Sequence, residues 1–262
     1  MAGNDPAIAI LGCDKVPVQR RALSSLDIHY AIGDVHGRDD MLAMMLGRIE
    51  AWHRWRHEGA KGVIVFVGDY IDRGMKSAEV IDRVMRGVAG FETVCLKGNH
   101  EQLMLDCLDT DDRDTWMHWL DNGGAETMAS LGLGAHDACD PVALAKALGS
   151  RRLQWLEQLP LTYQAGPYLF VHAGIVPGRP LAEQKPKDLI WIRDHFLDSE
   201  VDHGFVVVHG HTPSEVPEWK ANRINVDTGV VMYGQLTAVV LGAPDSPRFM
   251  TVEGEPGPGS ED

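Results

Sequence analysis

Five short polar segments, each directly after an apolar run, constrain this chain more than any other feature of its sequence. They are Gly33-Asp34-Val35-His36-Gly37, Gly68-Asp69-Tyr70-Ile71-Asp72-Arg73-Gly74, Gly98-Asn99-His100-Glu101, Val171-His172-Ala173-Gly174 and His209-Gly210-His211-Thr212. In α/β sheets, ligands bind beyond the strand ends, and glycine there lets the backbone turn tightly beside an ion or a phosphate. One such segment alone is typical of an ordinary turn, but five in one chain indicate a shared site.

The spacing of apolar residues predicts an α/β fold. Strands are expected at 28–32, 63–67 and 93–96, and helices at 39–57, at 77–88 and from about residue 101. Residues 109–159 read as mostly helical, with a break at Asn122-Gly123-Gly124. Strands are expected near 168–171, 205–209, 223–226 and 235–241, so the second half is richer in strands.

The 262 residues suit a single domain, which we place at 27–253. Residues 1–26 lack clear periodicity and are predicted to be a peripheral leader. Residues 254–262 are rich in glycine, proline and acidic residues, which is typical of a flexible tail.

The composition narrows the possible partners and the cellular setting. The formal net charge of −14 argues against binding to nucleic acids or anionic membranes. No apolar run reaches the roughly 20 residues of a membrane span, and no secretory signal is recognisable. The four cysteines, Cys13, Cys95, Cys107 and Cys139, form no C-x-x-C pair. We therefore expect a cytoplasmic monomer with free thiols.

The segments together resemble a known signature. The ordered pattern GDxHG, GDxxDRG and GNHE resembles that of the phosphoprotein phosphatase (PPP) family within the calcineurin-like metallophosphoesterases, over about residues 28–241. The later segments VHAGI and HGHTP resemble its small bacterial and phage branch, and the eukaryotic-type motif SAPNY is absent. The resemblance implies a calcineurin-like fold, a central β-sandwich of mixed sheets flanked by helices, with metals at the strand ends.

The resemblance also implies two divalent metal ions. The implied ligands are Asp34 and His36 for the first ion, Asp69 as the bridge, and Asn99, His172 and His211 for the second. Carboxylate, amide and imidazole donors suit Mn²⁺, which we expect, and also Fe or Zn²⁺. His209 is interpreted as a structural histidine rather than a ligand.

Four further residues are assigned to catalysis by the same resemblance. His100 is the implied general acid, oriented by Asp72, and Arg73 would grip phosphate oxygens. Arg193 is similar to a second phosphate clamp, although an ordinary surface arginine is the competing interpretation. Tyr70 and Glu101 are expected to support the loops, and no role is assigned to Asn122-Gly123-Gly124.

The implied reaction is hydrolysis of a phosphomonoester by a metal-activated hydroxide, without a covalent phosphoenzyme. Phosphorylated proteins or peptides carrying phosphoserine or phosphothreonine are the expected substrates. One alternative is a hydrolase of diadenosine tetraphosphate or a related nucleotide, which the intact GDYIDRG and GNHE motifs disfavour. A non-catalytic phosphate-binding module is the other alternative, and a missing ligand would favour it, but none is missing.

Overall fold

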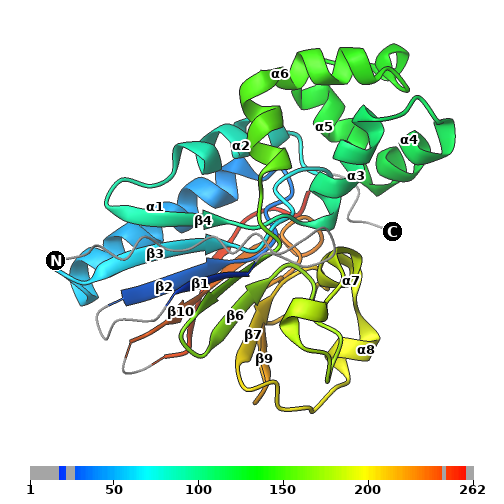
Figure 1. The fold of residues 1–262 in the computed structure, drawn as a ribbon. Helices are drawn as coiled ribbons and strands as arrows, with labels where there is room; N and C mark the ends of the chain where they lie inside the picture. Colours follow the sequence, from blue (N-terminus) through cyan, green and yellow to red (C-terminus); the bar gives the residue numbers. More distant parts are fainter. Residues whose placement is uncertain (1–17, 22–26, 244–245, 258–262) are drawn as a thin grey trace, which may run out of the picture.

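The computed structural model describes residues 18–21, 27–243 and 246–257, which form two mixed β-sheets flanked by helices (Figure 1). One sheet has the strand order β11-β10-β2-β3-β4, and the other has the order β1-β5-β6-β7-β9-β8. Strands β2, β3 and β4 run parallel to one another, as do β6, β7 and β9. The predicted α/β fold with a sandwich of mixed sheets is confirmed.

Strands and helices alternate in the first half of the chain, and most strands of the second sheet follow in the second half. The strands are β1 (Val18–Arg21), β2 (Asp27–Ile32), β3 (Lys61–Phe66), β4 (Phe91–Cys95), β5 (Thr162–Ala165), β6 (Tyr168–Val171), β7 (Val206–His209), β8 (Glu218–Trp219), β9 (Arg223–Asn225), β10 (Gln235–Leu241) and β11 (Arg248–Glu253). The α-helices are α1 (Asp39–Arg56), α2 (Ser77–Arg86), α3 (Asn99–Leu108), α4 (Arg113–Trp119), α5 (Ala125–Ser130), α6 (Pro141–Glu157), α7 (Pro186–Trp191) and α8 (Asp194–Leu197).

Strand β3 shows why the central strands are apolar throughout. Ile64 and Phe66 pack into the core under the helices, whereas Val63 and Val65 pack into the core between the two sheets. Because successive side chains point to opposite faces, a strand covered on both faces needs apolar residues at nearly every position. On the far side of the second sheet, a smaller core lies under α7 and α8.

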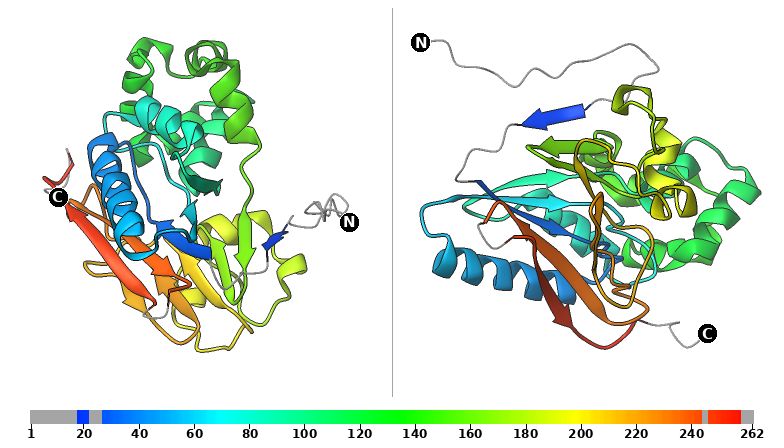
Figure 2. Two further views of the ribbon diagram at one scale, coloured as in Figure 1. Left: turned by 90° about the vertical axis from the view of Figure 1, so that its left-hand side faces the viewer. Right: turned by 90° about the horizontal axis from the view of Figure 1, so that it is seen from below.

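The helices α4, α5 and α6 gather beyond one end of the sheets (Figures 1 and 2). Between α4 and α5 the chain forms a short π-helical turn, η1 (Leu120–Gly124), at the predicted glycine break. We refer to residues 113–130 as the helical cap. The cap packs on α2 and α3, and α3 begins at one of the five polar segments.

The structure adds contacts at both chain ends. Residues 18–21, placed in the peripheral leader, form β1, which pairs in parallel with β5 at a sheet edge. Residues 254–257, placed in the flexible tail, are bound: Gly254 N donates to Gly234 O (2.9 Å) and Gly257 N donates to Val231 O (2.7 Å). The backbone groups of these short segments find partners in neighbouring elements, which composition does not reveal. The rest of the leader and tail lies outside the described residues.

Two other expectations concern thiols and membranes. Cys95, Cys107 and Cys139 are free, as expected, and Cys13 lies outside the described residues. Among the described helices, none is long and apolar enough to cross a membrane.

Candidate active site

The parallel topology brings the five polar segments to one edge of the sandwich. Each segment follows the carboxyl end of a strand: β2, β3, β4, β6 or β7. The six predicted metal ligands are all buried, and so are the predicted acid His100 and its partner Asp72. Segments far apart in sequence therefore meet in one place, as the pattern predicts for parallel strand ends.

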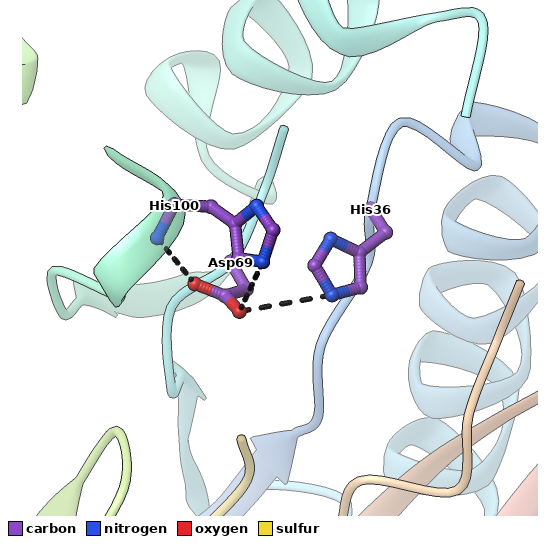
Figure 3. Close-up of side chains that lie close together, drawn as sticks. All are labelled: His36, Asp69 and His100. Atoms are coloured by element: carbon purple, nitrogen blue, oxygen red, sulfur yellow. Dashed lines mark hydrogen bonds and ion pairs between the residues drawn. The ribbon is translucent and has the colours of Figure 1, made fainter. Parts of the chain in front are cut away.

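Asp69 lies at the centre of the first group of side chains (Figure 3). Its Oδ2 atom is 3.7 Å from His36 Nε2 and 3.8 Å from His100 Nε2. Its Oδ1 atom accepts a hydrogen bond from the backbone N–H of His100 (3.1 Å). Burial opposes ionisation of Asp69, but the surrounding histidines, His172 and His100 foremost, outweigh it and hold its pKa below the usual value.

A second group forms on the other oxygen of Asp69. His172 Nε2 lies 3.4 Å from Asp69 Oδ1 and 2.8 Å from Asn99 Oδ1, and His211 Nδ1 lies 2.8 Å from the same Asn99 oxygen. Burial lowers the pKa of His172, so this ring is neutral near pH 7. Its Nδ1–H donates to Val67 O (3.0 Å), which leaves Nε2 as a lone pair facing two oxygen acceptors. Lone pairs that converge in this way fit a cation.

Asp34 supplies an independent test of that fit. Its Oδ2 atom accepts from the backbone N–H of His211 (3.0 Å), but its Oδ1 atom is buried without a hydrogen-bond partner in the described chain. A buried carboxylate oxygen without a partner is costly, and a bound cation satisfies it. Among the described residues, two groups could hold a metal, His36 with Asp69 and His100, and Asp69 with His172 and His211; Asp34 is in neither group, and its free Oδ1 atom is the observation that points to a cation there. Nitrogen and oxygen donors of this kind fit the divalent ions that the sequence implied.

His100 and Asp72 form a close pair. His100 Nδ1 lies 2.7 Å from Asp72 Oδ2, so Nε2 is left on the side of Asp69. Burial opposes protonation of His100, but Asp69 and the hydrogen bond to Asp72 outweigh it and raise its pKa. A histidine with a raised pKa beside a phosphate site can hold and deliver a proton at neutral pH.

The two predicted arginines face the same cleft. Arg73 places its guanidinium 2.9 Å from His36 Nε2 and 3.1 Å from His100 Nε2. Arg193 is exposed and lines, with Arg73 and His211, a cleft of about 530 Å³. A larger hollow of about 830 Å³ beside α3 and α7 contains none of the predicted ligands. The structure therefore brings Arg193 to the cleft, where a phosphate clamp would be needed.

Backbone strain is concentrated at this site. The residues with positive φ, apart from glycine, are His36 (42°), Asp69 (52°), Asp72 (72°), Arg73 (68°), Cys139 (61°) and His211 (67°) in the described chain. Such conformations cost of order 1–3 kcal/mol each and persist where the surroundings impose them, typically at functional sites. All but Cys139 are predicted site residues, so the strain marks this site independently of side-chain chemistry.

The structure also places Glu101 and His209. Glu101 accepts hydrogen bonds from the backbone N–H groups of Gly98, Asp69 and Tyr70 (2.9, 2.9 and 2.8 Å) and so ties two loops together. His209 lies next to Phe196, and its Nδ1 lies 3.0 Å from Gly210 O. It is absent from the two groups that could hold a metal among the described residues.

The sequence interpretation missed Asp227, which follows β9 and is buried at the same edge. Burial raises its pKa to about 6, and its charge contributes to the raised pKa of Asp34. A weaker signal was present, because Asp227-Thr228-Gly229 follows the strand predicted at 223–226, although only two of its four residues, Ile224 and Val226, are apolar. The sequence interpretation also missed Trp119 and Thr127, which belong to the helical cap and form hydrogen bonds with Asp72.

Comparison with known proteins agrees with this geometry. The family model described as calcineurin-like phosphoesterase matches residues 30–242. The chain belongs to this family. The serine/threonine-protein phosphatase 1 of Salmonella typhimurium is 30% identical over 218 residues, covering 79% of this chain and 89% of its own. The resemblance to phosphoprotein phosphatases is thereby confirmed.

Other relatives carry a different activity in their names. The asymmetrical bis(5'-nucleosyl)-tetraphosphatase PrpE of Anoxybacillus flavithermus is 28% identical over 246 residues, covering 81% of this chain and 89% of its own. A solved structure of a candidate diadenosine tetraphosphatase has a TM-score of 0.64 at 19% identity, covering 90% of this chain and 98% of that one. This likeness shows the shared fold.

We expect Gly210→Ala to weaken metal binding. A Cβ atom at Gly210 would lie 2.1 Å from Asp34 Oδ1, so the carboxylate must move away from its place. Divalent-metal affinity, measured by calorimetry on the chelated chain, should fall by about tenfold or more, as for other changes that displace a ligand. Gly47→Ala is the matched control, because a Cβ there meets nothing within 4 Å. Equal affinities in the two variants would contradict the role of Asp34 as a ligand.

Proposed function

We propose that this phosphoesterase is a metal-dependent phosphomonoester hydrolase that acts on phosphoserine and phosphothreonine in proteins or peptides. Family membership supports the coarser statement, a metallophosphoesterase. The proposal rests on one observation. At one edge of the cleft, atoms that could bind metals converge beside the His100–Asp72 pair and two arginines.

In this proposal, Asp34, His36 and Asp69 hold one divalent ion, and Asp69, Asn99, His172 and His211 hold the other. Bound ions, for which we propose Mn²⁺ with Fe or Zn²⁺ as alternatives, supply Lewis acidity and activate water. Residues of the protein itself carry out the remaining steps. Asp69 keeps its negative charge, since its pKa is held low, and it offers one oxygen to each group of ligands.

His100 serves as the general acid in this proposal. The Asp72 carboxylate holds His100 Nδ1, which leaves Nε2 to deliver a proton to the leaving alkoxide. Arg73 and Arg193 bind phosphate oxygens, and Arg73 leaves the histidine nitrogens to do so. Because the seryl and threonyl alkoxides are poor leaving groups, a positioned acid is needed for them.

The residues that line the cleft favour a phosphopeptide over a dinucleotide as the substrate. Besides Arg73 and Arg193, the cleft is lined by the acidic residues Asp121 and Glu126 of the helical cap. A phosphopeptide presents a single dianion, which the metals and arginines can satisfy. A dinucleotide polyphosphate brings further negative charges, and these would meet the two carboxylates.

A diadenosine tetraphosphate hydrolase is the second candidate function. The observation in its favour is that relatives about equally similar to this chain bear that activity in their names. Both candidates use the same metal chemistry, so the substrate comparison below separates them. A monomeric, cytoplasmic protein without nucleic-acid or membrane partners stays a prediction.

Metal removal should abolish phosphatase activity. We expect the chelated chain to be inactive on 4-nitrophenyl phosphate and Mn²⁺ to restore activity best. Asp69→Asn should be the most damaging change of a ligand, because Asp69 belongs to both groups of metal-binding side chains. Asp82→Asn, on the exposed side of α2, is the control. Full turnover after chelation, with metal analysis confirming removal, would refute the proposal.

His100→Asn should slow hydrolysis in a way that depends on the leaving group. On alkyl phosphates kcat should fall by about 10²–10⁴-fold, the usual contribution of a positioned acid. On 4-nitrophenyl phosphate the loss should be smaller, because nitrophenolate hardly needs a proton. His136→Asn, at a side chain that is 86% exposed, controls for the change of residue type. Equal losses on both substrates would show that His100 has another role.

Phosphoserine and phosphothreonine peptides should be cleaved with a higher kcat/KM than diadenosine tetraphosphate. Parallel measurements with Mn²⁺ test this expectation. In the double variant Asp121→Asn and Glu126→Gln, kcat/KM for the dinucleotide should rise more than for the peptides, because two repulsive charges are removed. A clear preference of the wild-type chain for the dinucleotide would favour the second candidate function instead.

A further inference from the structure

We propose that Trp119 and Thr127 of the helical cap are positioning residues that hold the Asp72 carboxylate, and through it His100, in the geometry needed for proton transfer. This inference rests on the proposed function, in which His100 is the general acid. Neither residue lies in the five polar segments, and both come from the region around Asn122-Gly123-Gly124.

The contacts to Asp72 are short and fully buried. Trp119 Nε1 donates to both carboxylate oxygens, at 3.1 Å to Oδ1 and 3.0 Å to Oδ2. The Thr127 hydroxyl donates to Oδ1 at 2.6 Å. His100 binds Oδ2, so the carboxylate has hydrogen-bond donors from the three helices α3, α4 and α5. Asp72 is 0% exposed. Hydrogen bonds to a buried charge are strong, and a carboxylate with several donors has one well-defined orientation.

Thr127 also binds the backbone that carries the carboxylate. Its Oγ1 atom accepts from the backbone N–H of Asp72 at 2.9 Å, while its own proton goes to the Asp72 side chain. Asp72 and Arg73 both have positive φ, a conformation that the surroundings must impose. The cap supplies part of that restraint, since Gly123 O accepts from Arg73 N at 3.1 Å.

The two glycines of the cap allow this close approach. A Cβ atom at Gly123, where φ is 99°, would lie 2.6 Å from Arg73 N. A Cβ atom at Gly124 would lie 2.6 Å from the Trp119 ring. A side chain at Gly123 would push the cap away from the loop of Asp72 and Arg73, and a side chain at Gly124 would displace the Trp119 ring within the cap. The glycine pair therefore allows the cap to pack against this loop, with Trp119 before the pair in the chain and Thr127 after it.

The arrangement has a functional consequence. If Asp72 loses a donor, the carboxylate can rotate, and His100 Nδ1 loses its fixed partner. His100 then spends less time with Nε2 directed to the leaving group, so the steps that need a proton slow most. Metal binding should not change, because the side-chain hydrogen bonds of Trp119 and Thr127 go to Asp72 and Ser77, which are not predicted ligands.

The experiment compares two pairs of variants in the metal-loaded chain. Thr127→Val removes the hydroxyl with little change of shape, and Thr127→Ser keeps it. Trp119→Phe removes the indole N–H. Trp116→Phe is its control, because Trp116 is equally buried, packs on Trp119 at 5.8 Å between ring centroids, and donates to Thr110 O instead of Asp72.

We expect Thr127→Val and Trp119→Phe each to lower kcat on a phosphoserine peptide by about tenfold, the usual effect of losing one hydrogen bond to a charged group. On 4-nitrophenyl phosphate the loss should be much smaller. Thr127→Ser and Trp116→Phe should show no such difference between substrates. Metal content and thermal unfolding, measured on all four variants, separate this effect from loss of folding.

The outcomes distinguish this inference from the proposed function. If His100→Asn shows the dependence on leaving group but Thr127→Val and Trp119→Phe do not, the positioning role is refuted and the proposed function stands. If the wild-type chain cleaves neither substrate, the proposed function itself fails. Equal losses on both substrates in Thr127→Val, with normal metal content, would also overturn the inference.

Discussion

The burial of several carboxyl groups at one edge of the sandwich is the constraint on which the site depends. Asp34, Asp69 and Asp227 all lie there, and burial raises the pKa of Asp34, which the charges of Asp227 and Asp69 raise further. Like charges out of water are unfavourable unless cations or protons balance them. His172 turns a lone pair toward this edge, because its Nδ1 atom donates to Val67 O and burial lowers its pKa. The site is therefore built to be completed by cations, which matches the family to which the chain belongs.

Holding these groups together also requires backbone restraint. The loops after β2, β3 and β7 contain residues with positive φ at the site itself. Glu101 ties the loop after β3 to the start of α3, and the helical cap binds the same loop from the other side. The cap is thus more than a cover for the sheets. It carries the acidic residues of the cleft wall and the two side chains that fix Asp72.

The relatives explain why metal chemistry alone does not name the substrate. Proteins named as phosphoprotein phosphatases and as dinucleotide tetraphosphatases share the fold and align over similar lengths of this chain. The ligands that hold metals act on the reacting phosphate, which both kinds of substrate contain. Discrimination must come from the cleft beyond that phosphate, whose lining includes Asp121, Glu126 and the loop at residues 229–232.

The sequence by itself determined the elements that depend on local pattern. Periodicity predicted the strands from β2 to β4 and the helices α1 and α2. A glycine stands beside five of the six predicted ligands and two residues after the sixth, His172. Asp227 follows the strand predicted at 223–226, but that strand is only half apolar, so the same local rule points to Asp227 more weakly.

Only the tertiary structure decided which distant groups meet. Trp119 and Thr127 read as ordinary helical residues, and their contact with Asp72 arises because η1 bends the cap onto the loop after β3. Tertiary packing likewise decides that residues 254–257 bind the loop after β9 and that Arg193 lines the cleft. Sequence spacing specifies the geometry within a helix or strand, whereas contacts between elements depend on how those elements pack around a common core.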